Sequence, residues 1–392
     1  MSKTVVISGV GRSTVGRKLG ISGIKLAIES IADALEDSGL SLKDIDGVST
    51  WPGQNQQMKG TGPVGVPQIK EALRLELNWF SGGSEAPGQL GAFINAYAAI
   101  EAGLARHVVV IRTVVESTAQ AAMRAAPPPK QEAPQPVGGP MQWLLPFHAF
   151  SPTNWFAQHA AAHFAKYGTT REQLGQIALN GRRNALLNPV ALMKTPLTMD
   201  EYLSARMIST PFCLLDCDQA ADGSVAVILS HRDAAKDLKH RPITVESVGG
   251  ALHGRDSIDQ FVDMATMEGQ VDSARMMWAR TDLKPKDVDF GAIYDGFSFL
   301  TLAWLEALGF CGRGEGGAFI EGGHNISREG ILPINTDGGQ LSGVRLHGYG
   351  FLYEACKQLW GDAGERQLTR KHQVAAVAVG GGSHAACTLL TL

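Results

Sequence analysis

Two stretches of the chain share one seven-residue pattern, Leu-x-x-Lys-Asp-Ile/Val-Asp, at residues 40–46 and 283–289. Each stretch follows a segment with the apolar spacing of a helix and precedes a run typical of a β-strand. The two stretches lie about 240 residues apart, a spacing far longer than the repeats of solenoid proteins. Alternating strand and helix patterns are typical of α/β domains. The sequence therefore predicts an internal duplication of an α/β domain.

The chain has 392 residues, too many for one small hydrophobic core. We expect an N-terminal domain over residues 1–240 and a C-terminal domain over 241–392. Residues 125–140 are rich in proline and glycine, and residues 150–210 have a largely helical pattern. We therefore expect an insertion at about 116–212, carried by the first domain, and insertions of this length usually serve as lids or binding segments.

Composition excludes several classes of function. The net charge is −3 and no basic stripe is present, which argues against a nucleic-acid partner. The longest apolar runs are no longer than a strand, so no membrane span is expected. Five cysteines are too few for a disulfide framework and indicate the reducing cytoplasm. No second Cys/His pair accompanies Cys213 and Cys217, so we expect no metal site.

Two glycine-rich segments lie in the first half. Residues 81–84, Ser-Gly-Gly-Ser, precede an apolar helical pattern, where free backbone N–H groups would suit a developing oxyanion. We interpret Ser81 and Gly82 as candidate oxyanion donors, and a capped core helix without a chemical role is the alternative. Residues 11–18 nearly match a phosphate-binding pattern, but Arg17 replaces its lysine and no Ser or Thr follows Lys18. We interpret this segment as a loop between strand and helix.

The second half has two further glycine-rich segments. In residues 335–350, Arg345, His347 and Tyr349 alternate, so an extended backbone would place all three side chains on one side. A buried strand at 374–379 runs into three glycines, which indicates a close approach of the backbone to another group.

Together these motifs resemble those of the thiolase superfamily, in its sterol-carrier-protein-type branch, over essentially the whole chain. The resemblance implies two duplicated α/β domains in a five-layer αβαβα arrangement, with an inserted loop domain over a CoA channel. The matching stretches are residues 216–227, 294–297, 335–339 and 380–382.

The chain lacks the three catalytic side chains that the thiolase pattern expects. Ser81 stands in the place of the nucleophilic cysteine, Arg345 in that of the activating histidine, and Ala378 in that of the second cysteine. Serine is a poor substitute for a thiolate nucleophile. The chain thus resembles the lipid-transfer-protein-like aldolases of steroid side-chain degradation, which lack these cysteines. It shares with them Tyr294 and the Leu-Ser-x4-His-Gly run at 341–348.

This resemblance implies a retro-aldol cleavage of a β-hydroxyacyl-CoA without a covalent intermediate, and no cofactor besides the CoA of the substrate. Tyr294 is the expected base, and the charge of Arg345 is expected to lower its pKa. His347 or Tyr349 is the expected acid. The expected oxyanion donors are the backbone N–H groups near Ser81, Gly82 and Gly382, and the expected substrate-binding residues are His384 and Asn335.

Two other functions stay open from the sequence. One is an atypical acyltransferase that uses Ser81, and the other is a non-catalytic subunit that binds acyl-CoA and scaffolds a partner. The resemblance also implies a homodimer and allows an OB-fold zinc-ribbon partner protein.

Overall fold

The computed structural model describes residues 3–50, 60–82, 90–127, 137–139, 141–235, 238–251, 262–370 and 372–392. The first half contains β1 (Val5–Arg12), α1 (Gly23–Ser38), β2 (Gly47–Thr50), α2 (Val66–Leu73), β3 (Trp79–Gly82), α3 (Gly91–Glu101), β4 (His107–Val115) and β7 (Asp222–His231). The second half contains β8 (Ile243–Gly250), α9 (Glu268–Trp278), β9 (Phe290–Ile293), α10 (Ser298–Ala307), α11 (Gly316–Ile320), α12 (Tyr349–Trp360), β10 (Val374–Gly381) and β11 (His384–Thr391).

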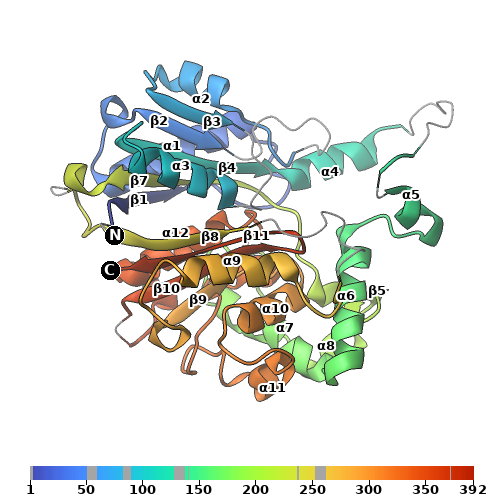
Figure 1. The fold of residues 1–392 in the computed structure, drawn as a ribbon. Coiled ribbons are helices and arrows are strands. Elements are labelled where there is room, and N and C mark those ends of the chain that lie inside the picture. Colours follow the sequence, from blue (N-terminus) through green and yellow to red (C-terminus); the bar gives the residue numbers. More distant parts are fainter. Residues whose placement is uncertain are drawn as a thin grey trace.

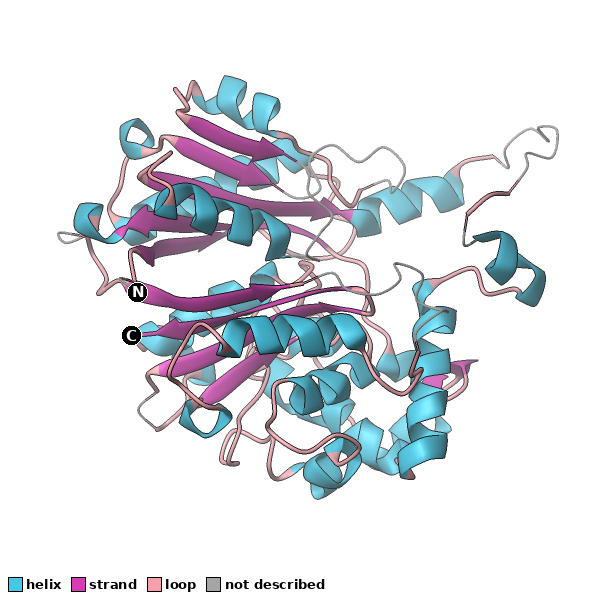
Figure 2. Ribbon diagram, viewed as in Figure 1, coloured by secondary structure: helices cyan, strands magenta, loops and turns pink. Residues whose placement is uncertain are grey.

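The strand order repeats between the halves (Figures 1 and 2). The sheet runs β3-β2-β4-β7-β1-β8-β11-β10-β9, and β1 and β8 meet at its centre through Val6–Thr244 and Ile7–Ile243. Read outward from this centre, β1-β7-β4-β2 corresponds to β8-β11-β10-β9, with the same parallel and antiparallel pairings. The counterpart of β3 is reduced to one parallel bridge between Gly291 and Ile334. The predicted duplication is therefore visible in the topology.

The helices form layers around the two halves of the sheet. Helix α1 packs on β1, β7 and β4, whereas α9 packs on β8 and β11. Helix α12 contacts strands of both halves, β7 and β1 as well as β10 and β9, and α3 contacts β4, β7 and β8. Strand β4 accordingly alternates between two cores, with Val108 and Val110 facing one and Val109 and Ile111 the other. This confirms the thiolase fold with its αβαβα layers.

The duplicated pattern has a structural cause. Each copy forms a turn of 3₁₀-helix before a strand, at Leu42–Asp44 before β2 and at Pro285–Asp287 before β9. The last aspartate of each copy then accepts hydrogen bonds at the start of the neighbouring parallel strand. Asp46 accepts from the backbone N–H of His107 (2.9 Å), and Asp289 accepts from that of Val374 (2.9 Å). An aspartate at the same place in each copy therefore aligns β2 with β4 in the first half and β9 with β10 in the second.

A long, mostly helical segment separates β4 from β7. It contains α4 (Glu116–Ala125), α5 (Met141–Leu144), α6 (Pro152–Tyr167), α7 (Arg171–Ala185), α8 (Met199–Ser204) and the small hairpin β5 (Met207–Ser209) and β6 (Phe212–Cys213). Helices α4 and α5 project from the body, whereas α7 packs on α10 and α11 of the second half (Figure 1). No helix among the described residues is long and apolar enough to cross a membrane.

The segment 335–350 differs from its expected extended form. Residues Gly339–Gly343 form a π-helical turn, His347 has a left-handed backbone (φ 49°), and Tyr349 is the first residue of α12. Close packing on the Asp295 carboxylate explains the turn, because the backbone N–H of Gln340 donates to Asp295 Oδ1 at 2.7 Å. A Cβ on Gly339 would lie 2.1 Å from Asp295 Oδ2, so only glycine fits.

Asn335 fastens the start of this segment to β9. Its Oδ1 accepts from the backbone N–H of Ile293 (2.7 Å) and its Nδ2 donates to the Ile293 carbonyl (2.8 Å). Because both ends of the amide are engaged, its visible role is to hold the end of β9, directly before Tyr294. Its expected substrate contact stays a prediction.

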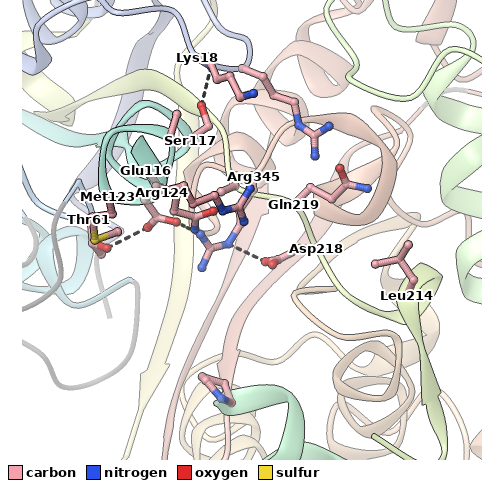
Figure 3. A pocket seen from close by; sticks show the side chains of 15 residues that line it. Lys18, Thr61, Glu116, Ser117, Met123, Arg124, Leu214, Asp218, Gln219 and Arg345 are labelled. Carbon is pink, nitrogen blue, oxygen red and sulfur yellow. Dashed lines mark hydrogen bonds and ion pairs between the residues drawn. The ribbon is translucent and has the colours of Figure 1, made fainter. Parts of the chain in front are cut away.

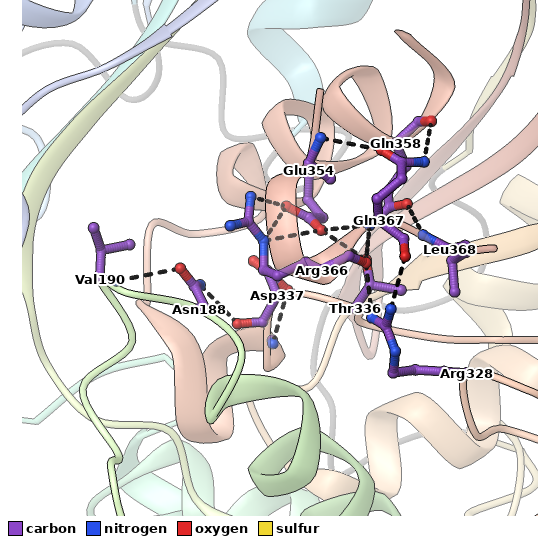
Figure 4. A network of polar contacts seen from close by, with 12 residues as sticks. Asn188, Val190, Arg328, Thr336, Asp337, Glu354, Gln358, Arg366, Gln367 and Leu368 are labelled. Atoms are coloured by element: carbon purple, nitrogen blue, oxygen red, sulfur yellow. Dashed lines mark hydrogen bonds and ion pairs between the residues drawn. The ribbon is translucent and has the colours of Figure 1, made fainter. Parts of the chain in front are cut away.

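A buried polar network fastens the same segment to α12 (Figure 4). Thr336 Oγ1 donates to Glu354 Oε1 (2.8 Å), and Glu354 forms an ion pair with Arg366 (2.9 Å). Gln358 Nε2 donates to the Arg366 carbonyl (2.7 Å). On the other side, Asn188 Nδ2 donates to the Asp337 carbonyl (2.8 Å). The loop is thus held by hydrogen bonds between α12 and the residues that follow α7.

Asp295→Asn tests the burial of this carboxyl group. Burial raises the pKa of Asp295 to about 7, against about 3.9 in an unfolded chain. Between these values the folded protein holds one proton more than the unfolded one, so the carboxyl's contribution to stability falls as pH rises. The free energy of unfolding is measured in urea from pH 4.5 to 7 for wild type and variant. We expect its slope against pH to be less negative in the variant than in wild type, by about 1.4 kcal/mol per pH unit.

The matched control is Asp282→Asn, a change at an exposed aspartate. Parallel stability curves for wild type and Asp295→Asn would contradict the predicted linkage.

Candidate active site

A pocket of about 1020 Å³ opens beside helix α4 (Figure 3). Its walls come mainly from the β1–α1 loop at residues 17–18, α4 at 116–124 and the segment 214–220, all in the first half. Arg345 is the one lining residue from the second half.

Arg345 lies between two carboxylates in this pocket. Its guanidinium forms an ion pair with Glu116, and its Nε donates to Asp218 Oδ2 at 2.7 Å (Figure 3). Burial, and secondarily the charge of Arg112, lowers the pKa of Arg345 to about 10, so it remains a cation at neutral pH. Glu116 pairs with this charge, while burial, and secondarily the charge of Asp295, raises the pKa of Asp218 well above its ordinary value.

His347 lies deeper, on the other side of Glu116. Its Nε2 is 3.0 Å from Glu116 Oε1, and its Nδ1 contacts the Arg112 guanidinium. Burial, then the charges of Arg345 and Arg112, hold the pKa of His347 well below its ordinary value. Because arginine only donates, the neutral imidazole accepts at Nδ1 and carries its proton on Nε2.

Arg112, in β4, is the cation at the centre of the site. It is 1% exposed, and its guanidinium donates to the Thr61 carbonyl and to His347. Burial lowers the pKa of Arg112 to about 9, while the hydroxyl groups of Tyr349 and Tyr294 act in the opposite direction. The sequence analysis expected Arg345 to lower the pKa of Tyr294, and that role stays a prediction. The structure adds Arg112 as a second cation that interacts electrostatically with Tyr294, while Glu116 and Asp218 bind Arg345.

Tyr294 directly follows β9 and is 6% exposed. Its backbone N–H donates to the Ala378 carbonyl (2.9 Å), and its ring meets Phe351 edge-on. Strand β9 is the last full strand on this side of the sheet, because the counterpart of β3 in the second half is reduced to the single bridge between Gly291 and Ile334.

Tyr349 is completely buried at the start of α12. Burial raises its pKa, which the charge of Arg112 and the backbone of Phe93 in α3 only partly oppose. The phenol of Tyr349 is therefore protonated at neutral pH. The structure brings Tyr294, Tyr349 and His347 together around Arg112, although no extended strand aligns them.

Other predicted site residues have contacts elsewhere. Ser81 and Gly82 end strand β3, where Ser81 Oγ accepts from Asn95 (3.3 Å), and the residues between Gly82 and Leu90 lie outside the described part. Gly382 lies in the β10–β11 turn, and its carbonyl accepts from Gly269 of α9 (3.1 Å). His384 Nδ1 is 2.9 Å from Ser383 Oγ. The roles predicted for these residues stay predictions.

Sequence reasoning missed Arg112, Glu116 and Asp218. A single arginine inside the run Val-Val-Val-Ile-Arg-Thr-Val-Val was a usable signal, since a charge in a buried strand needs partners. Glu116 and Asp218 gave no such signal, because their importance depends on Arg345, which is distant in the sequence.

No cysteine belongs to this cluster, and all five are in the described part of the chain. Cys387 lies directly across from Ala378 in the β10–β11 ladder. It is fully buried, and burial raises the pKa of its thiol. Such a thiol is a poor nucleophile.

Comparisons with known proteins agree with this fold. Residues 250–391 match the family described as thiolase C-terminal domain-like. A steroid side-chain-cleaving aldolase of Thermomonospora curvata is 30% identical over 365 residues, 91% of this chain and 90% of that protein. The 17-hydroxy-3-oxo-4-pregnene-20-carboxyl-CoA lyase of Mycobacterium tuberculosis is 30% identical over 370 residues, 92% of each chain.

Solved structures agree as well. The Ltp2-ChsH2(DUF35) aldolase superposes with a TM-score of 0.87 at 28% identity, over 99% of this chain and 98% of that one. Human mitochondrial 3-ketoacyl-CoA thiolase shares the fold, with a TM-score of 0.70 at 15% identity over 99% of this chain and 98% of the human one. The chain therefore belongs to the thiolase superfamily, in the branch that contains the steroid side-chain-cleaving aldolases.

Proposed function

We propose that this protein is an acyl-CoA aldolase, a carbon–carbon lyase that cleaves a β-hydroxyacyl-CoA into a carbonyl compound and a shortened acyl-CoA. The observation that carries the proposal is the buried Arg112 guanidinium, which contacts His347 and interacts electrostatically with the hydroxyl groups of Tyr294 and Tyr349, in a cluster without a thiol. Such a cluster can move a proton and stabilise negative charge, which is all that a retro-aldol cleavage requires.

In the first step Tyr294, as its phenolate, removes the proton of the β-hydroxyl group. The Cα–Cβ bond breaks as the carbonyl forms at Cβ, and its electron pair passes into the thioester as an enolate. A free tyrosine has a pKa of about 10, so the phenolate needs a nearby positive charge. The buried guanidinium of Arg112 is the proposed source of that charge, while Glu116 pairs with Arg345 and His347.

In the second step the enolate takes a proton at Cα, and Tyr349 is the proposed donor because burial keeps it protonated. The proton that Tyr294 took up then passes to Tyr349 and replaces the one that Tyr349 gave, so both tyrosines return to their starting states. During this transfer Arg112 stabilises the phenolate on either tyrosine. No proton is gained or lost overall. Because its pKa is lowered, His347 is neutral and is not the proposed proton donor. Its proposed role is to orient the Arg112 guanidinium, which it contacts.

Substrate and partners are inferred from the relatives. Two relatives are named for steroid side-chain cleavage, so we expect a steroid or similar acyl group on CoA. The solved Ltp2 aldolase contains ChsH2(DUF35), which favours a partner of the OB-fold zinc-ribbon type. The proposed oxyanion donors are backbone N–H groups near Ser81, Gly82 and Gly382. The five unpaired cysteines favour the cytoplasm.

Two other functions predict different results. An acyltransferase that uses Ser81 would form an acyl-enzyme detectable by intact mass. A non-catalytic scaffold would leave the activity of its complex unchanged when Tyr294 is altered.

Tyr294→Phe removes the proposed base and keeps the packing of the ring. We expect the turnover rate of a β-hydroxyacyl-CoA to fall by roughly 10²- to 10⁴-fold. The rate is measured from the release of the carbonyl product. Melting temperature and CoA-ester binding should change little. Tyr353→Phe, on α12 beside Arg12, is the matched control. Near-wild-type turnover by Tyr294→Phe would show that another residue is the base.

Ser81→Ala tests for a covalent route. The proposed mechanism uses only backbone N–H groups there, so the variant should keep most of its aldolase activity. A loss of about a thousand-fold or more would instead indicate a serine nucleophile and acyl transfer.

We also propose a homodimer that pairs along β3. This strand lies at one end of the sheet, and its Phe80 is 66% exposed. An unpaired sheet edge with an exposed aromatic residue favours pairing with a second chain, and an edge lysine opposes it. We expect light scattering to give a dimer for wild type and for the control Ile331→Lys, and a monomer for Phe80→Lys. A wild-type monomer at micromolar concentration would reject the dimer.

A further inference from the structure

Glu116 is a buried carboxylate that the proposed reaction steps do not use. It is the first residue of α4, four positions after Arg112, and is 6% exposed. Its Oε1 accepts a hydrogen bond from Thr61 Oγ1 (3.0 Å) and lies 3.0 Å from His347 Nε2. Its Oε2 accepts from the Arg345 guanidinium (Figure 3). The two oxygens of this one side chain therefore have different kinds of neighbour.

Both neighbours of Glu116 Oε1 bind the same cation. The Arg112 guanidinium donates to the backbone carbonyl of Thr61 and contacts His347 Nδ1. The orientation of a buried guanidinium depends on how firmly its acceptors are held, because its donors need them in place of water. Thr61 and His347 thus each connect Glu116 with Arg112.

The position of the proton on His347 decides whether this arrangement is stable. Because arginine only donates, Nδ1 has to be an acceptor beside Arg112, and the single proton of the neutral ring is then on Nε2. A carboxylate oxygen 3.0 Å from Nε2 favours this tautomer, since it attracts the positive end of the N–H bond. The other tautomer would place an Nδ1–H against the donors of Arg112 and a lone pair beside the carboxylate.

We propose that Glu116 is a positioning residue, which keeps the proton of His347 on Nε2 and so orients the Arg112 guanidinium for its action on the tyrosines. This inference rests on the proposed function of Arg112 and adds the residue that fixes its orientation. Arg345 has a part in the same arrangement, because it binds Oε2 and leaves Oε1 to Thr61 and His347.

Glu116→Gln tests this role with an amide of the same size as the carboxylate. Arg345 can only donate, so the amide oxygen takes the place of Oε2 and the NH₂ group lies towards Thr61 and His347. An NH₂ group opposes an Nε2–H and favours a lone pair there. The proton of His347 should therefore move to Nδ1, and Arg112 then loses this acceptor.

The matched control, Glu306→Gln, changes a similar pair outside the cluster. Glu306 Oε1 lies 3.0 Å from Nε2 of the buried His163, between α10 and α6. NMR of the whole protein with ¹⁵N-labelled histidine identifies the tautomer of each ring, and His347→Gln and His163→Gln assign the two sets of signals. Steady-state kinetics with a β-hydroxyacyl-CoA give kcat and KM.

We expect the proton of His347 on Nε2 in wild type and in Glu306→Gln, and on Nδ1 in Glu116→Gln. The kcat of Glu116→Gln should fall about 10- to 100-fold, as the loss of one hydrogen bond to a charged group predicts, with KM nearly unchanged. The kcat of Glu306→Gln should stay near that of wild type.

A proton on Nδ1 of His347 in wild type would overturn the proposal, and this measurement does not depend on the folding of any variant. The same tautomer in wild type and Glu116→Gln would also overturn it, as would an equal fall of kcat in Glu306→Gln. If the tautomer changes as expected but wild type cleaves no β-hydroxyacyl-CoA, the aldolase proposal fails and the positioning of Arg112 by Glu116 stands.

Discussion

The buried guanidinium of Arg112 is the interaction on which the candidate active site depends. A charged group in an apolar interior is stable only where its donors find acceptors. Arg112 finds them in the Thr61 carbonyl and in His347, and its charge interacts with the hydroxyl groups of Tyr294 and Tyr349. Removing one partner of a buried charge typically costs about 3–5 kcal/mol. The positions of the segments that carry these residues are therefore coupled through one side chain.

The same cluster joins the two halves of a duplicated fold. The halves share one strand order, yet they contribute different groups at their junction. The first half brings Arg112 and Glu116, and the second brings Arg345 and His347. The ion pairs of Arg345 and the contact of His347 with Glu116 cross between the halves. Duplication thus supplied the framework, and divergence at the junction supplied the chemistry.

The missing thiols and the buried cation suit the same proposed reaction. Ala378 and Ser81 stand where the thiolase resemblance expects cysteines, and Cys387 is buried opposite Ala378. A site without a thiolate cannot use thiol-based acyl transfer. The buried charge of Arg112, which interacts with Tyr294 and Tyr349, instead favours proton transfer with stabilised negative charge. The proposed reaction needs only to move a proton and break one carbon–carbon bond.

The sequence by itself determined the local elements and their order. Helix α1 begins after Ser22 and ends at Gly39, whose left-handed backbone (φ 81°) closes it, as the pattern predicts. The duplicated pattern, the thiolase fold and Tyr294 at the end of a strand were also readable, because each depends on short-range spacing or on motif order.

Only the tertiary structure showed what each cation contacts. Sequence analysis expected Arg345 to act on Tyr294. In the structure Glu116 and Asp218 bind Arg345, and Arg112 is a second, buried cation that interacts electrostatically with Tyr294 and Tyr349. His347 and Tyr349 likewise reach Arg112 through a π-helical turn rather than a strand, because the Asp295 carboxylate binds the loop backbone. These contacts join residues far apart in the chain, so their geometry follows from the docking of the two halves and not from any local pattern.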